Sequence, residues 1–333
     1  MKRVIWVSIL LGIAGILLPA FFGGRGVDAS PFETQPPEDI SPSPSPSYVQ
    51  MKAKISDKDT VVSVMSGEDI KEIAMAEHLP LVLAAEMPAS FEKEALRAQA
   101  VAARTYILYC TKHENPKHAD ADVCCDSSCC LACLEENELR ASWGAAYEEN
   151  MEAIRSAVKD TDGQVLYYED EPILASFHSS SAGMTEAGSE LWGDVPYLVC
   201  VSSPETEKDV PDFVTTVEVS AENMKETILL IKPEAAFSGS GETWIGERVL
   251  DESGRVKTIS VGGQTLTGSE MRKLFSLRST AFTLEYTKGI FVFTVTGYGH
   301  GLGLSQYGAN VMAKNGFDYL EILAHYYPNT IIE

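Results

Sequence analysis

Five cysteines and a histidine fall within one short stretch of this chain, and their crowding points to a metal site. The stretch, residues 118–133, reads HADADVCCDSSCCLAC. Thiolate and imidazole are the ligands that Zn²⁺ prefers, and a closed set of four protein ligands holds that metal in a structural role. Disulfides are the alternative, and they persist only outside the reducing cytoplasm. The whole chain has seven cysteines, two pairs of them adjacent in sequence, which fits tidy pairing poorly and favours metal.

A second candidate for chemistry is Glu86, which lies between small and apolar neighbours in residues 83–91, LAAEMPASF. Partial desolvation raises the pKa of a carboxyl group and keeps it protonated near neutral pH. A general acid for a glycosidic oxygen requires that state. A single glutamate at a helix end is more often a cap or a surface group, so these residues alone give only a weak signal.

A third candidate is the glycine-rich stretch 297–303 with the residues beside it. Its glycines do not follow the spacing of a nucleotide-binding loop between a strand and a helix. We expect them to allow tight turns that let His300 and Gln306 approach a sugar. His178 is a further candidate for a substrate contact.

These residues need elements to position them, and the sequence predicts helices first and strands later. Pro80 is suited to begin a helix that Met87 and Pro88 end, and Ser90 is suited to cap the next helix. A hairpin is expected around residues 287–289, and residues 306–327 are expected to be helical. The pattern indicates an α+β protein with a helix-rich part at about 67–160 and a β-rich part at about 161–333.

The N-terminal region predicts the topology. Lys2 and Arg3 precede an uncharged apolar run, residues 4–22, which is long enough to span a bilayer with its N-terminus in the cytoplasm. We therefore expect a cytoplasmic stub and transmembrane anchor at 1–25, although a cleaved signal peptide is the alternative. Residues 26–47 are rich in Pro and Ser and should form a disordered, semi-stiff linker. Residues 48–333 would then form the ectodomain of a membrane protein that crosses the membrane once, and this ectodomain would lie outside the cytoplasmic membrane.

Charge excludes one class of partner. The formal net charge is −22, and a nucleic-acid binder needs a clustered basic face. We therefore expect no nucleic acid among the ligands.

Several long motifs resemble one known family, the sporulation protein D/amidase-enhancer (LytB) family. They are AAEMPASF at 84–91, EALRAQAVAARTY at 94–106, GHGLGLSQYGA at 299–309 and YLEILAHYYP at 319–328, with shorter matches at 177–179 and 192–193. These matches run in the family's order across most of the chain, which makes the resemblance specific.

The resemblance implies roles for individual residues. Glu86 falls at the family's catalytic glutamate and Arg104 at its active-site arginine. Substrate contacts are implied for Tyr197, His178, Ser179, His300, Gln306 and Tyr307. Many relatives have Lys two residues after the tyrosine, where this chain has Val199. Relatives with a zinc set place it on His118, Cys124, Cys129 and Cys130, which leaves Cys125 and Cys133 as extra thiols that could exchange with a ligand.

The resemblance also implies an activity. Relatives are lytic transglycosylases that cut denuded peptidoglycan glycan strands to 1,6-anhydro-muramic ends during engulfment in endospore formation. One carboxylic acid suffices for that reaction, because no water enters. The implied location is the mother-cell membrane facing the forespore, and the implied partners are the amidase P and the membrane protein M of the same stage. The alternative is a noncatalytic glycan-binding activator of an amidase.

Overall fold

The computed structural model describes residues 55–333 except 114, 191, 192 and 194, and within them the chain is a mixture of helices and strands, as expected. The α-helices are α1 (Met75–Glu86), α2 (Lys93–Lys112), α3 (Glu136–Trp143), α4 (Tyr147–Asp160), α5 (Ala221–Ile231), α6 (Gly268–Leu274), α7 (Gln306–Lys314) and α8 (Tyr319–Tyr326). Short 3₁₀ turns are η1 (Gly144–Ala146), η2 (Gly188–Glu190) and η3 (Gly241–Trp244).

The strands form small sheets. In sheet order they are β2 (Asp69–Ala74), β1 (Val61–Ser66) and β3 (Val123–Cys124); β10 (Gln264–Thr267), β9 (Val256–Val261) and β8 (Ile245–Leu250); β11 (Phe282–Thr287), β12 (Ile290–Thr296) and β7 (Val214–Ser220); β13 (Leu304–Ser305) and β6 (Phe177–His178); and β14 (Ile331–Ile332), β4 (Leu166–Tyr168) and β5 (Glu171–Pro172). Most pairs are antiparallel, but β3 runs parallel to β1 and β13 runs parallel to β6.

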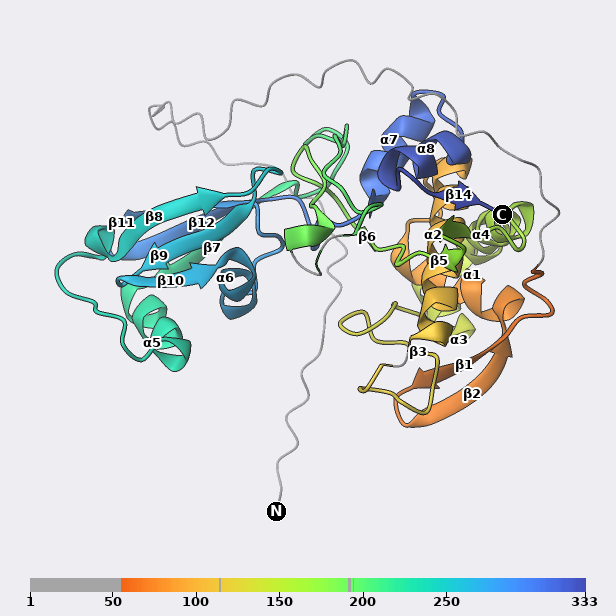
Figure 1. Ribbon diagram of the computed structural model, residues 1–333, viewed down its shortest axis with the longest axis horizontal. Coiled ribbons are helices and arrows are strands. Elements are labelled where there is room, and N and C mark those ends of the chain that lie inside the picture. The colour runs from red at the N-terminus through yellow and green to blue at the C-terminus, as the bar shows by residue number, and fades with distance from the viewer. Residues whose placement is uncertain (1–54, 114, 191–192, 194) are drawn as a thin grey trace. The chain divides into compact units, whose positions relative to one another are not determined.

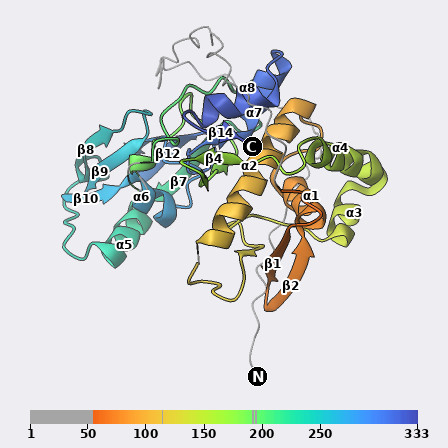
Figure 2. The same ribbon diagram turned by 45° about the vertical axis from the view of Figure 1, so that its right-hand side comes forward.

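The helix α2 is the centre of the first hydrophobic core. It packs against α1, α4, α7 and α8, which surround it in Figures 1 and 2. Its buried face is rich in alanine, from Ala95 to Ala103, and small side chains let neighbouring helices approach closely. Residues 306–326, which form α7 and α8, therefore pack on the same helix as the other helices of the segment 75–160, although the two segments are far apart along the chain.

A second core lies between β-strands and two helices. Strands β7, β11 and β12 with α5, and strands β8–β10 with α6, enclose buried side chains that include Phe291 and Phe293. Strand β12 alternates buried and half-exposed residues over its length, as a strand with one covered face should. The predicted hairpin is confirmed: Lys288 and Gly289 form a two-residue loop with φ values of 49° and 90°. Positive φ at both positions matches the twist of the flanking strands.

Two local predictions were wrong. The first helix begins at Met75, so that Pro80 lies inside it. Proline favours the first turn of a helix. Met75 and Leu79 are fully buried, and their packing extends the helix to residues on the N-terminal side of Pro80. Ser90 does not cap α2, which begins at Lys93. The backbone N–H of Glu92 is instead bound by the side chain of Asn310, at 2.8 Å.

The predicted ends of other helices agree better. The first helix ends at Glu86, directly before Met87 and Pro88. The predicted C-terminal helix is divided into α7 and α8 at Gly316, which has a φ of +91° that an L-residue rarely adopts. The expected anchor and linker lie outside the described residues. Within the described part of the chain, no helix has the length and apolar character needed to cross a membrane.

Candidate active site and metal centre

Glu86 lies at the last position of α1, half-buried. Its Oε1 accepts a hydrogen bond of 2.7 Å from the backbone N–H of Ala132, and its carboxyl group is also bonded by the side chain of Gln306. Burial raises the pKa of Glu86, while these two hydrogen bonds oppose part of the rise. The environment therefore favours a carboxyl group that stays protonated to higher pH than an ordinary glutamate, as a general acid requires.

Gln306, which contacts Glu86, lies at the start of α7. Ser305 caps this helix by accepting a hydrogen bond of 3.2 Å from the N–H of Gly308, and Gln306 is the first helical residue. The ring of Tyr307 meets the ring of Phe91 edge-on at 5.0 Å, and its N–H donates to the carbonyl of Ser179 at 3.1 Å. Four predicted site residues, Glu86, Gln306, Tyr307 and Ser179, are thus joined by direct contacts.

The glycine-rich stretch, which was predicted to allow tight turns, also lets two strands come close together. Gly303 has a φ of +65°, and a Cβ there would lie 2.0 Å from the carbonyl oxygen of Ser176. Only glycine allows this approach. It permits the parallel pairing of β6 with β13 and so sets the position of Gln306 next to Glu86.

The two predicted histidines have different surroundings. His178 is 4% exposed; its Nδ1 donates to the carbonyl of Leu302 at 3.1 Å, and its Nε2 lies 2.6 Å from the hydroxyl of Ser181. Burial holds the pKa of His178 well below its usual value. Both ring nitrogens are therefore used inside the protein, and the substrate contact predicted for His178 stays a prediction.

His300 is half-buried, and its ring lies 5.8 Å from that of His178. Its Nδ1 accepts from the N–H of Leu302 at 3.0 Å. Burial, with the charges of Arg272 and Arg255, lowers the pKa of His300 to about 4. A hydrogen bond to the backbone of Phe177 opposes part of this shift, and the ring is neutral at physiological pH. The predicted substrate contact of His300 stays a prediction.

Tyr197 is half-buried and holds a neighbouring loop. Its hydroxyl accepts a hydrogen bond of 3.1 Å from the N–H of Leu174, and its ring lies 5.7 Å from that of Tyr168. Neither of these contacts joins Tyr197 to Glu86. The structure thus leaves its predicted substrate role as a prediction.

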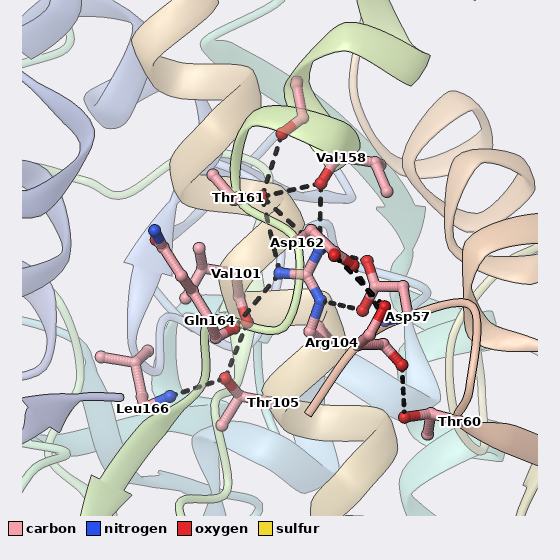
Figure 3. Close-up of polar contacts among 12 residues, drawn as sticks. Asp57, Thr60, Val101, Arg104, Thr105, Val158, Thr161, Asp162, Gln164 and Leu166 are labelled. Carbon is pink, nitrogen blue, oxygen red and sulfur yellow. Dashed lines mark hydrogen bonds and ion pairs between the residues drawn. The ribbon is translucent and has the colours of Figure 1, made fainter. Parts of the chain in front are cut away.

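Arg104 occupies a closed interior network, which Figure 3 shows. Its side chain has no exposed surface, and its Nε and Nη2 donate to the two carboxylate oxygens of Asp57, each at 2.7 Å. The remaining donors reach Thr161 at 3.5 Å and the carbonyls of Val158 and Gln164 at 3.2 Å. A guanidinium whose nitrogens are all bound inside the protein has none free for a glycan. In this geometry Arg104 ties the loop before β1 and the end of α4 to α2, and its predicted active-site role stays a prediction.

The predicted ligands of the metal centre come together. His118, Cys124, Cys129 and Cys130 each bring one ligand atom to within 4.8 Å of the others. The Nδ1 of His118 donates to the carbonyl of Ala121 at 2.9 Å, so its Nε2 faces the sulfur of Cys130 at 3.0 Å. A hydrogen bond of this kind fixes the ring and leaves the other nitrogen free for a metal. These residues could hold a metal ion.

The two remaining cysteines of the stretch 118–133, Cys125 and Cys133, are not among the four metal-site residues. Cys125 and Cys133 form a disulfide, so the disulfide interpretation holds for this pair, while the other four residues could hold a metal ion. The exchange of Cys125 or Cys133 with a ligand is thereby excluded in this structure. Cys110 of α2, which the sequence analysis did not single out, is hydrogen-bonded to Cys130.

Comparison with known proteins places the chain. The SpoIID family model, described as Stage II sporulation protein, matches residues 65–168. Stage II sporulation protein D of Bacillus amyloliquefaciens is 33% identical over 277 residues, which cover 81% of this chain and 78% of that protein. The protein of the same name from Bacillus subtilis (strain 168) is 34% identical over 273 residues, which cover 80% and 76%. The chain belongs to the stage II sporulation protein D family.

A second kind of relative also matches. The amidase enhancer of Bacillus subtilis (strain 168) is 30% identical over 303 residues, covering 75% of this chain and 39% of that protein. The resemblance inferred from the motifs is thus confirmed. The part matched by the SpoIID family model includes Glu86, Arg104 and the four metal-site residues, whereas Gln306 and Tyr307 lie beyond it.

Three residues near the site of this SpoIID-family chain could not be identified from the sequence. Asp57 binds Arg104, and Ala132 binds Glu86 through its backbone. Glu205 is buried, and its carboxylate accepts hydrogen bonds from the N–H of Ser181 at 2.6 Å and from the hydroxyl of Ser305, the cap of α7. Burial raises the pKa of Glu205. No spacing signal links these residues to their partners, because each pair is joined only by the fold.

Proposed function

We propose that the chain is a peptidoglycan lytic transglycosylase that cleaves denuded glycan strands to 1,6-anhydro-muramic ends. The observation that carries this proposal is the setting of Glu86. It is a half-buried carboxyl group with a raised pKa, and the groups that contact it are two hydrogen-bonding amides. Within the described residues, no second carboxylate is among the groups that shift its pKa. A glycosidase that uses water as its nucleophile needs such a partner at a fixed distance.

In the proposed reaction, Glu86 gives its proton to the glycosidic oxygen as the bond to C1 of N-acetylmuramic acid breaks. The resulting carboxylate then takes the proton of the C6 hydroxyl group, whose oxygen bonds to C1. One proton is given and one is taken, so Glu86 ends as it began and no water is consumed. Gln306 would hold the carboxyl group in place, and Tyr307 and Ser179 would line the approach of the sugar.

We propose zinc for the metal centre, in a structural role. The soft donor set of three thiols and one imidazole suits that ion. At a Zn–S distance of about 2.3 Å, tetrahedral ligand atoms lie roughly 3.8 Å apart, which the observed 4.8 Å limit accommodates. A four-ligand set leaves no open position for substrate, so zinc would fix the loop at 118–133 rather than take part in bond cleavage.

The remaining parts of the proposal concern location and partners. We propose a cytoplasmic stub and membrane anchor at 1–25, a linker at 26–47 and an ectodomain at 48–333 that works outside the mother-cell membrane during engulfment. Membership of the sporulation protein D family supports this setting. The amidase P and membrane protein M of the same stage would be its partners.

The amidase-enhancer relative favours one second candidate: a glycan-binding activator without catalysis of its own. A single experiment separates the two. Full-length protein is incubated with denuded glycan strands in water enriched in ¹⁸O, and the products are analysed by mass spectrometry. Anhydro-muramic ends without label support the transglycosylase. Intact strands, with stimulation of an added amidase, would establish the activator instead. Reducing ends that carry ¹⁸O would mean an ordinary hydrolase.

A further inference from the structure

The backbone N–H of Ala132 holds the carboxyl group of Glu86 by a hydrogen bond, and Ala132 lies inside the cysteine-rich loop. The disulfide between Cys125 and Cys133 closes a ring that contains Ala132. Two of the metal-site residues, Cys129 and Cys130, lie in the same ring, and their N–H groups both donate to the carbonyl of Asp126, at 2.9 and 2.8 Å. The ring is therefore internally tied as well as covalently closed.

The ring is also fastened to the rest of the protein on both sides of Ala132. Leu131 is 7% exposed and packs in the first hydrophobic core. The N–H of Cys125 donates to the carbonyl of Met65 at 2.9 Å, next to the pairing of β3 with β1. The backbone at Ala132 thus has a buried side chain just before it and a disulfide cysteine just after it. Such a backbone group has little freedom to follow a neighbouring side chain.

The direction of the hydrogen bond has a chemical consequence. The N–H of Ala132 donates to Oε1 of Glu86 at 2.7 Å. In a protonated carboxyl group the carbonyl oxygen is a stronger acceptor than the hydroxyl oxygen, so this bond favours the form in which Oε1 is the carbonyl oxygen. It therefore favours the transferable proton on Oε2. An acid that must give a proton to one atom and take one from another needs this orientation to be fixed beforehand.

We infer that Ala132 is a positioning residue for Glu86: its N–H, held by the disulfide ring, selects which carboxyl oxygen delivers the proton. This inference rests on the proposed role of Glu86 as the acid. It also gives the cysteine-rich loop a function beyond stability, because opening the ring would release the group that orients the acid.

The test compares three variants of the full-length chain. Ala132→Pro removes the N–H, since proline has no backbone donor, while Ala132→Gly keeps it. The paired change Cys125→Ser/Cys133→Ser opens the ring and leaves the four metal-site residues in place. Loss of a hydrogen bond to a charged group should lower kcat of Ala132→Pro roughly tenfold or more, with little change in glycan affinity. Ala132→Gly should stay within about twofold of wild type.

The pH profile and a spectroscopic readout distinguish positioning from general damage. The N–H stabilises the carboxylate, so its removal should raise the pKa of Glu86 and move the alkaline limb of kcat/KM to higher pH. The same pKa can be followed directly by NMR of ¹³C-labelled glutamate, with the Glu86→Gln variant identifying the signal. Equal kcat and equal Glu86 pKa in Ala132→Pro and Ala132→Gly would overturn the inference.

Two further outcomes have assigned meanings. If Ala132→Pro fails to fold, the disulfide variant decides: lower kcat at unchanged glycan affinity supports the inference, and unchanged kcat overturns it. If wild type makes no anhydro-muramic ends, the proposed function fails. The NMR comparison then still tells whether the N–H of Ala132 controls the protonation of Glu86.

Discussion

Replacing Arg104 tests whether this residue supports the fold or contacts the substrate. Arg104 and Asp57 form a bidentate pair in which the side chains are 0% and 3% exposed. In Arg104→Met the side chain keeps most of its volume but leaves Asp57 as a buried carboxylate without its partner. Removing one partner of a buried pair costs about 3–5 kcal/mol. For a domain of this size that cost lowers the midpoint of thermal unfolding by roughly 6–20 °C.

The experiment measures thermal unfolding by circular dichroism and binding to denuded glycan strands, the latter well below the lowest midpoint. We expect Arg104→Met to unfold early but to bind glycan with nearly wild-type affinity while it is folded. The matched control is Arg155→Met, because Arg155 pairs with Glu136 at 2.9 Å on the surface, with side chains 48% and 51% exposed. A surface pair contributes about 0–1 kcal/mol, so this control should keep the wild-type midpoint.

A double-mutant cycle sharpens the result. Asp57→Asn alone leaves a buried cation, whereas Arg104→Met with Asp57→Asn leaves no buried charge. The double variant should therefore be less destabilised than the sum of the two single variants. The interpretation fails if Arg104→Met keeps the wild-type unfolding midpoint and loses glycan binding. Arg104 would then be the substrate contact that the family resemblance implied.

The remaining predictions concern the acid, the metal and the membrane. Glu86→Gln should lower kcat by about 10²–10⁴-fold while glycan still binds. The control is Glu92→Gln, because Glu92 is exposed, and it should cleave glycan at nearly the wild-type rate. An equal loss in both variants in a glycan-cleavage assay would contradict the role of Glu86. Because the pKa of Glu86 is raised and the acid must be protonated, kcat/KM should fall with rising pH above the range of an ordinary glutamate; a decline centred near pH 4 would contradict this. Elemental analysis of the purified protein should find about one zinc per chain. The double variant Cys124→Ser/Cys130→Ser should have both a lower zinc content and a lower thermal stability. Full thermal stability of the metal-free protein would argue against the metal centre. If residues 4–22 anchor the chain as expected, protease added to intact protoplasts should digest the ectodomain, and complete protection would reject that orientation.

Features set by neighbouring residues could be predicted from the sequence. The hairpin at 287–289 depends on two adjacent positions that accept positive φ, and the end of α1 depends on Met87 and Pro88. The candidate metal site is similar in that its crowded thiols and imidazole lie within 118–130, a loop short enough to bring them together, although the family resemblance selected the four residues. In each case the local chain restricts its own conformation enough to be interpreted alone.

Features set by distant contacts could not be predicted. The start of α1 is decided by the burial of Met75 and Leu79, and this outweighs the preference of Pro80 for a first turn. The partner of Arg104 lies 47 residues earlier in the sequence, in a loop with no pattern that marks it. A family motif records that an arginine occupies this position, but the same residue type serves equally well as a substrate clamp or as an internal tie.

The contact between Ala132 and Glu86 shows a stronger form of the same difficulty. A backbone N–H is present at every residue except proline, so its use by a site has no signature in residue type. What the sequence does contain is the set of restraints around it: the cysteines on either side and the apolar Leu131 beside it. Under the inference drawn above, the cysteines beside the Glu86 motif do more than stabilise a loop, because they also restrain the backbone of Ala132. Only the fold reveals that this backbone N–H lies 2.7 Å from the carboxyl group of Glu86.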